Sequence, residues 1–176
     1  AGKTTLMKLI QNVIPKNSGT VRIGGYDHVK QELLAKNLIG FIMEHPFFEA
    51  KSLETNAKLF GKFYEKYNHK QFLVYLERFH LDKMIEYGKL SKGMQTKFQL
   101  AFALSHEAKL LIMDEPTTAL TETEIDVLFN IIETLKKEGV GIIYISHRMD
   151  ELKRITDRVI VMRDGQYIAT LPTKET

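Results

Sequence analysis

Two apolar stretches in the second half of the chain constrain the fold most. One is KLLIMD at residues 109–114, and the other is VGIIYIS at residues 140–146. The second is a continuous apolar run, of the kind found in strands that are buried on both faces of a parallel sheet. A sheet covered in this way needs helices on both of its sides. We therefore expect an α/β fold built on a mostly parallel sheet.

The order of predicted elements divides the chain into three parts. Residues 6–14 have helical periodicity and residues 38–43, LIGFIM, predict a buried strand. Periodicity is helical throughout residues 52–104, with Ser52 as a plausible N-cap, and strands return at residue 109. This order predicts one α/β core, residues 1–46 and 108–176, interrupted by an all-helical subdomain at residues 47–107.

Composition excludes several classes of site. The chain has 176 residues, enough for one domain with an inserted subdomain, and its net charge of +3 is too small to argue for a nucleic-acid partner. It has no cysteine, which excludes disulfides and thiolate metal sites. No apolar run approaches the ~18 residues of a membrane span, so we expect any membrane role to come through a partner chain.

Two acidic residues end the first of these strands, in the sequence LLIMDEP. Ligands of α/β proteins bind at the carboxyl ends of the strands. There Asp114 can hold Mg²⁺, and Glu115 can polarise a water molecule against a phosphate. The alternative interpretation is a solvated acidic turn, which the four preceding apolar residues make the minority reading.

The first residues, Gly2-Lys3-Thr4-Thr5, match the second half of a phosphate-binding loop. In such a loop the backbone amides face the phosphates, the lysine reaches their oxygens and a hydroxyl holds Mg²⁺. Taken alone, this short match favours the alternative, a lysine that simply begins a helix.

Four motifs together resemble the ATP-binding cassette (ABC) ATPases: Lys3-Thr4, LSKGM, LLIMDEP and YISH, in that family's order and approximate spacing. The resemblance covers essentially the whole chain. It implies a P-loop NTPase (RecA-like) fold with ATP and Mg²⁺ as ligands. It further implies a set of site residues: Gly2, Lys3, Thr4 and Thr5 in the phosphate loop, Asp114 and Thr4 on the metal, Glu115 as catalytic glutamate and His147 as switch histidine.

LSKGM stands where this family has its signature motif, LSGGQ. By resemblance, Ser91 and Gly93 meet the ATP bound to the opposite subunit of a head-to-tail dimer. A Ser-x-Gly sequence at a helix N-terminus is also a physically suitable anion site. The alternative is that Ser91 is only an N-cap, and both interpretations can hold together. Lys92 and Met94 depart from the family pattern.

His147 and Glu44 are weaker candidates. His147 ends a predicted strand, where its ring can bond a phosphate and orient water with Glu115, although a lone histidine is more often structural. Glu44 stands where the family usually has a glutamine that contacts Mg²⁺ and water. A carboxylate is still an oxygen ligand, and the alternative is an ordinary loop glutamate. Thr121 replaces an aspartate that many members carry.

These features predict an ATP-binding and ATP-hydrolysing subunit that powers a membrane transporter. The expected partners are a second ABC ATPase subunit, identical or different, and transmembrane permease subunits, with no nucleic acid. We expect a cytoplasmic protein at the inner face of the cell membrane. The permease is expected to dock near residues 44–50 through Phe47 and Phe48, although burial of this pair in the protein's own core is the favoured alternative.

Two other functions stay open. One is a soluble cassette protein acting on ribosomes or DNA, and the other is a folded remnant without activity. The sequence begins with the second half of the phosphate loop, so several of the amides that would bind phosphate are missing from it. We therefore expect the 176-residue chain to bind ATP weakly and hydrolyse it negligibly, and a version extended upstream to do both. The front half resembles multidrug or lipid export cassettes, whereas the last third resembles monosaccharide import cassettes, which leaves the cargo open.

Overall fold

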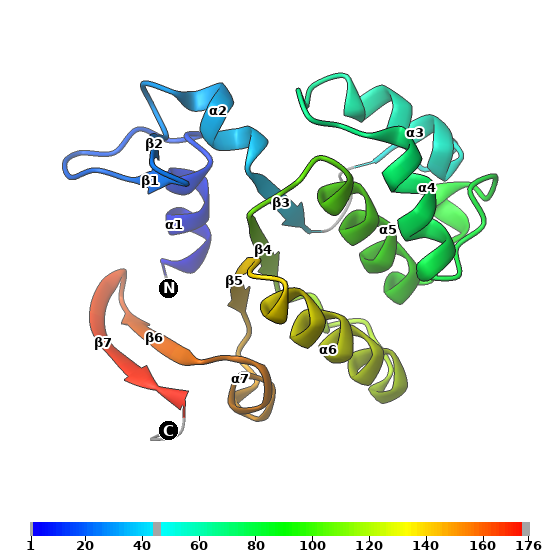
Figure 1. The fold of residues 1–176 in the computed structure, drawn as a ribbon. Coiled ribbons are helices and arrows are strands. Elements are labelled where there is room, and N and C mark those ends of the chain that lie inside the picture. The colour runs from blue at the N-terminus through cyan, green and yellow to red at the C-terminus, as the bar shows by residue number, and fades with distance from the viewer. Residues whose placement is uncertain (1, 44–46, 174–176) are drawn as a thin grey trace.

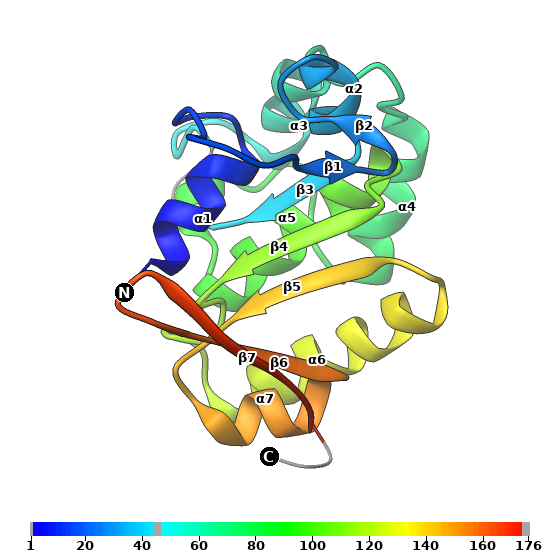
Figure 2. The ribbon, with the colours of Figure 1, turned by 90° about the vertical axis from the view of Figure 1, so that its left-hand side faces the viewer.

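A parallel sheet of three strands lies at the centre of the molecule. The computed structural model describes residues 2–43 and 47–173. The strands β3 (Ile39–Ile42), β4 (Leu110–Asp114) and β5 (Gly141–Ile145) pair side by side in that order, with β4 in the middle. The predicted α/β fold with a parallel sheet is thus confirmed. Figure 2 shows the three strands running in the same direction.

Helices cover the sheet on both sides (Figure 1). On one side lie α3 (Leu53–Gly61), α4 (His69–Arg78), the 3-10 turn η1 (Tyr87–Lys89), α5 (Lys92–Ser105) and α6 (Glu122–Lys137). On the other lie α1 (Lys3–Ile10), α2 (Glu32–Asn37) and a small hairpin of β1 (Arg22–Ile23) and β2 (Tyr26–Asp27). The chain ends in α7 (Met149–Ile155) and an antiparallel hairpin of β6 (Arg158–Arg163) and β7 (Gln166–Pro172).

Side chains that alternate along the central strand separate the core into two layers. Leu111 and Met113 pack with the helices α3 to α6, whereas Ile112 packs with Met7 and Ile39 on the opposite face. A strand flanked by strands and covered on both faces must be apolar at every inner position. This accounts for the unbroken apolar run of β4.

The apolar run of β5 has a different environment from the one predicted. Within the described residues β5 is an edge strand, and its residues alternate between exposed and half-buried until Ile145. Ile143 is 36% exposed. The prediction that this strand is buried on both faces is therefore wrong here, because apolar character alone does not distinguish a central strand from an edge strand.

The first helix begins earlier and ends earlier than the predicted residues 6–14. Gly2 has a φ of 97° and acts as N-cap, so helical geometry starts at Lys3 and ends at Ile10. Met7 is the buried residue of this helix, whereas Val13 lies beyond it and is 62% exposed. A left-handed residue before a helix favours glycine, which explains the early start.

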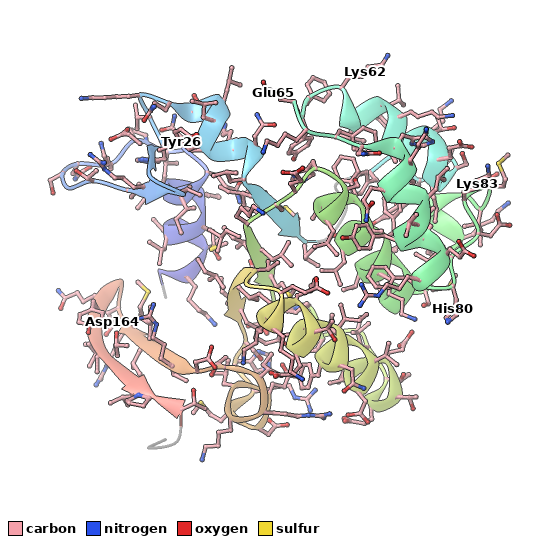
Figure 3. The ribbon with its side chains drawn as sticks, viewed as in Figure 1. Tyr26, Lys62, Glu65, His80, Lys83 and Asp164 are labelled. Atoms are coloured by element: carbon pink, nitrogen blue, oxygen red, sulfur yellow. The ribbon has the colours of Figure 1, made fainter. Side chains whose placement is uncertain are left out.

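The helical part of the chain was predicted more accurately. Residues 52–104 contain helices and, among the described residues, only one isolated β-bridge between Ser52 and Glu86. Ser52 is the N-cap of α3 and accepts a hydrogen bond from the Thr55 amide, as predicted. The boundaries of a separate subdomain at residues 47–107 stay a prediction. Figure 3 shows His80 and Lys83 on the outer side of these helices.

No helix within residues 2–43 and 47–173 is both long and apolar enough to cross a bilayer.

A buried histidine makes the stability of the helical region depend on pH. His106 is 1% exposed, its ring stacks on Tyr64 at 3.9 Å, and its Nδ1 contacts the Asn37 carbonyl oxygen at 3.3 Å. Burial disfavours the charged ring and lowers the pKa of His106 from its ordinary 6.5 to about 4. Between these values the unfolded chain binds the proton more readily than the folded one.

We therefore expect the free energy of unfolding to fall as the pH drops from 6.5 to 4, by about 3 kcal/mol in total, and then to level off. Urea unfolding at a series of pH values measures this slope. His106→Gln should flatten the curve in this window, and His80→Gln, at an exposed position, should not. An unchanged slope in His106→Gln would contradict the assignment.

Candidate active site

The register of the sheet brings Glu115 beside His147. Asp114 pairs with Ile145 in the parallel ladder, and the Glu115 amide donates to the Ile145 carbonyl oxygen at 2.9 Å. Glu115 and His147 therefore follow strand ends that lie side by side at the same edge of the sheet. The Nδ1 atom of His147 lies 2.8 Å from Oε2 of Glu115, in a pair that joins the ends of two neighbouring strands.

The contact fixes which ring nitrogen of His147 carries a proton. An ionised carboxylate can only accept hydrogen bonds, so Nδ1 must be the donor toward Glu115. The other ring nitrogen, Nε2, is then the one that can contact a ligand. Because the His147 side chain is 71% exposed, that second nitrogen belongs to an open site, not to the core.

Lys3 reaches the same carboxylate from the other side. Its Nζ atom lies 3.6 Å from Oε1 of Glu115, and both side chains are partly exposed. Lys3 stands at the first position of α1, so the positive end of that helix also points toward this site. Lys3 is far in sequence from Glu115 and His147, and the structure brings the three side chains together.

The N-terminal glycine also contacts the C-terminal hairpin. A Cβ atom added to Gly2 would lie 2.9 Å from the Cα of Gly165, in the turn between β6 and β7. Figure 2 shows the N-terminus beside this turn, which Figure 3 marks with Asp164. Only glycine accommodates both the positive φ and the close approach. The first residue of the candidate phosphate-loop segment thus lies against the hairpin turn.

The residues predicted to hold Mg²⁺ supply suitable oxygen atoms. Asp114 is exposed at the end of β4 and Thr4 is exposed in the first turn of α1. A carboxylate and a hydroxyl beside a lysine and a helix N-terminus are the donor set that magnesium with a phosphate requires. Among the described residues, no group of three acidic or histidine side chains is arranged to hold a metal ion. Thr5 is exposed nearby in α1, and Glu44 lies outside the described residues.

A hollow between α5 and the carboxyl end of β4 adjoins the acidic pair. Its walls include Ile42 and Met43 at the end of β3, Lys92 and Gln95 of α5, and the residues Asp114, Glu115, Pro116, Thr118 and Ala119. The start of α5 therefore lines the same hollow as the two carboxylates.

Ser91 and Gly93 both lie against Glu124 of α6. Ser91 is the N-cap of α5, as its alternative interpretation predicted, and it accepts from the Met94 amide at 3.2 Å. Its hydroxyl also donates to Oε1 of Glu124, at 3.2 Å. A side chain at Gly93 would collide with that same carboxylate. Thr121 and Glu124 form a capping box at the start of α6, which places this acid against the LSKGM segment.

The two phenylalanines proposed for docking have different environments. Phe47 packs into the helical core, with ring centroids 4.8 Å from Phe98 and 4.9 Å from Phe60. Phe48 is 56% exposed. Phe47 is thus half-buried against the core, in the direction of the favoured alternative, whereas Phe48 is mostly exposed.

Comparison with protein families identifies this arrangement. The model of the family "ABC transporter" matches residues 1–118, which carry the candidate phosphate loop, the LSKGM segment and the acidic pair. The chain belongs to this family. Its fold is that of the P-loop NTPases, and nucleotide binding is the property this ABC family implies.

Similar ABC proteins cover nearly the whole chain. A putative ribose/galactose/methyl galactoside import ATP-binding protein 2 of Burkholderia cenocepacia (strain HI2424) is 40% identical over 189 residues, 100% of this chain and 37% of that protein. The ribose import ATP-binding protein RbsA of Geobacillus kaustophilus (strain HTA426) is 39% identical over 193 residues, 100% of this chain and 38% of that protein. The chain thus spans well under half the length of these relatives.

Solved ABC structures have the same fold. The ATP-binding subunit of an ABC transporter matches with a TM-score of 0.85 and 25% identity, covering 99% of this chain and 75% of that one. The cbiO1 protein of Clostridium perfringens, described as part of the ABC transporter complex cbiONQ, matches with a TM-score of 0.83 and 25% identity, covering 98% and 73%. The likeness of the front half to export cassettes stays a prediction.

Sequence reasoning missed two residues around this ABC site. Gln99 of α5 is buried; its side-chain oxygen accepts from the Met43 amide at 2.8 Å, and its side-chain nitrogen donates to the Tyr87 hydroxyl. Glu151 of α7 is also buried, beside the strand ends. Both are polar residues on amphipathic helices, and no signal in the sequence distinguishes them from solvent-facing ones.

Proposed function

We propose that the subunit to which this chain belongs binds and hydrolyses ATP and acts in pairs to power a membrane transporter. The observation that carries the proposal is the meeting of Lys3, Glu115 and His147. One cation, one carboxylate and one imidazole lie at the carboxyl end of a parallel sheet, with 2.8 Å between acid and ring. These are the groups that phosphoryl transfer to water requires.

Each residue has a distinct role in this proposal. Lys3 and the backbone amides of α1 bind the phosphates. Glu115 accepts the proton of the attacking water, whose oxygen bonds to the terminal phosphorus as the bond to the ADP oxygen breaks. His147 donates from Nδ1 to Glu115 and thereby orients the carboxylate. Its Nε2 atom can donate to an oxygen of the transferred phosphate when the ring is protonated on both nitrogens.

Mg²⁺ would be held by Thr4 and Asp114, with Glu44 as a further candidate. When bound, the ion neutralises part of the phosphate charge. The exposure of Thr4 and Asp114, and the oxygen character of both, support this assignment.

A second subunit completes each site in this proposal. Within one chain Ser91 bonds Glu124, and none of the interactions described for residues 2–43 and 47–173 joins it to Lys3 or Glu115. In a head-to-tail pair, Ser91 and Gly93 would meet the ATP molecule bound to the other chain. Two chains placed head to tail would therefore build two equivalent sites.

The proposed partners follow from the relatives. ATP-binding proteins named for ribose and galactose import favour a permease partner and a monosaccharide cargo. We propose that the protein works at the cytoplasmic face of the membrane, where Phe48 provides an exposed apolar contact for the permease.

Subunit mixing tests the head-to-tail arrangement. Lys3→Ala removes the phosphate lysine, and Ser91→Glu places a negative charge at the signature segment. Each variant alone should release no phosphate from magnesium ATP, because both sites of its homodimer are defective. Mixing the two variants should restore hydrolysis, since one site of each mixed dimer combines an intact Lys3 with an intact Ser91.

Ser52→Glu is the matched control, because Ser52 is also an N-cap but belongs to α3. It should retain hydrolysis when tested alone. An active Ser91→Glu homodimer, or a mixture as inactive as its components, would contradict the shared site.

A further inference from the structure

Glu151 is a carboxylate buried under the candidate active site. It is the third residue of α7 and is 2% exposed. An isolated charge in such a place is strongly unfavourable, so a buried carboxylate requires donors on all sides. Glu151 has such donors, and the four side chains that supply them all precede α7 in the sequence.

Four side chains donate to this carboxylate. The Thr117 hydroxyl lies 2.8 Å from Oε1, the Tyr144 hydroxyl 2.8 Å from Oε2 and the Ser146 hydroxyl 3.0 Å from Oε2. Arg148 contributes a charged contact from its guanidinium to Oε1 at 3.0 Å. Burial raises the pKa of Tyr144, so this hydroxyl remains a proton donor over the whole working range of pH.

These donors flank the two residues assigned to catalysis. Thr117 follows Glu115 by two positions in the segment after β4. Ser146 and Arg148 are the immediate neighbours of His147 after β5. The Ser146 hydroxyl also accepts from the Arg148 amide at 3.0 Å, which closes the turn that carries His147. One carboxylate is therefore bonded to both segments whose ends must meet at 2.8 Å.

We propose that Glu151 is a positioning residue that holds His147 and Glu115 in their bonded arrangement, through Thr117 on one side and Ser146 and Arg148 on the other. The proposal rests on the proposed function of that pair. Glu151 does not touch the phosphate in this scheme. Its negative charge cannot be replaced by a neutral group, because four donors converge on two oxygens and an amide offers only one acceptor atom.

The first experiment observes the tautomer of His147 by nitrogen-15 NMR, with His147→Gln to assign its signals. In the wild type the neutral ring should carry its proton on Nδ1, because Glu115 accepts there. Glu151→Gln should convert this single tautomer to a mixture. This measurement needs no turnover, so it tests the positioning role even if the protein does not hydrolyse ATP.

The second experiment measures hydrolysis of magnesium ATP. Glu151→Gln should lower kcat by about 10–100-fold, the usual effect of removing a group that orients a reacting residue, and leave KM nearly unchanged. Thr117→Val should act in the same direction, and the double variant should lose less than the product of the two losses. Thr117→Ser keeps the hydroxyl and should restore the wild-type rate.

Asn56→Ala is the control for stability alone. Asn56 is fully buried, and its side chain bonds the 48–52 segment of the helical region, away from the strand ends. It should lower the melting temperature without changing the tautomer of His147. Wild-type kcat and tautomer in Glu151→Gln would overturn the proposal, and so would a mixed tautomer in Asn56→Ala. Both kcat measurements use a version of the chain extended upstream, and absence of hydrolysis by that wild type would contradict the proposed function instead.

Discussion

Replacing Glu115 by glutamine is expected to lower kcat for ATP hydrolysis by about 10²–10⁴-fold. The amide keeps the size of the side chain but cannot accept the proton of the attacking water. In the proposed mechanism phosphate binding depends on Lys3 and on backbone amides, so ATP affinity should be retained or increase as the 3.6 Å contact between Lys3 and the carboxylate loses its charge. Phosphate release and equilibrium ATP binding measure the two effects separately.

Glu138→Gln is the matched control, since Glu138 is exposed at the end of α6. It should leave both quantities unchanged. A Glu115→Gln protein that turns over at the wild-type rate would exclude this residue as the base. A protein that loses ATP binding along with turnover would place Glu115 in ground-state binding instead.

Replacing Phe98 by alanine is expected to reduce the free energy of unfolding by about 3–5 kcal/mol. Phe98 is fully buried in α5, and its ring meets those of Phe47, Phe72 and Tyr87 at centroid distances of 4.8, 5.8 and 5.4 Å. Removing it leaves a cavity where three elements meet. Chemical unfolding followed by circular dichroism measures the loss.

Phe48→Ala makes the same chemical change at an exposed position of the same region. Its effect on stability should stay within about 0.5 kcal/mol. An equal loss in both variants would show that the aromatic cluster does not form the core of the helices. Phe48→Ala has a second use, because weakened binding to a permease with unchanged stability would support the proposed docking contact.

Local signals in the sequence predicted the helices and their caps well. Ser52, Ser91 and Thr121 each begin a helix in the structure, because a hydroxyl that accepts from a free amide works through neighbouring residues alone. The turn at Asp164 and Gly165 depends on residue preferences that are just as local. Both residues have positive φ, at 50° and 79°, which these residue types tolerate.

Features that depend on distant parts of the chain could not be predicted in this way. The acidic pair and His147 were expected at strand ends, but their 2.8 Å contact follows from the register between β4 and β5, which no local pattern specifies. The exposure of β5 depends on which strand is the edge strand. Burial of Glu151 depends on four donors from three segments, and its sequence context is that of an ordinary amphipathic helix.

The backbone at Glu115 has one further consequence. Its φ of 48° lies in the left-handed region, where a residue with a side chain is strained and glycine is not. Among all replacements, glycine would therefore suit this backbone best, yet it would remove the carboxylate that meets both Lys3 and His147. Selection for thermostability alone would therefore favour Glu115→Gly, which removes this carboxylate from the candidate site. The stability of this turn and the proposed chemistry of Glu115 therefore favour different residues at the same position.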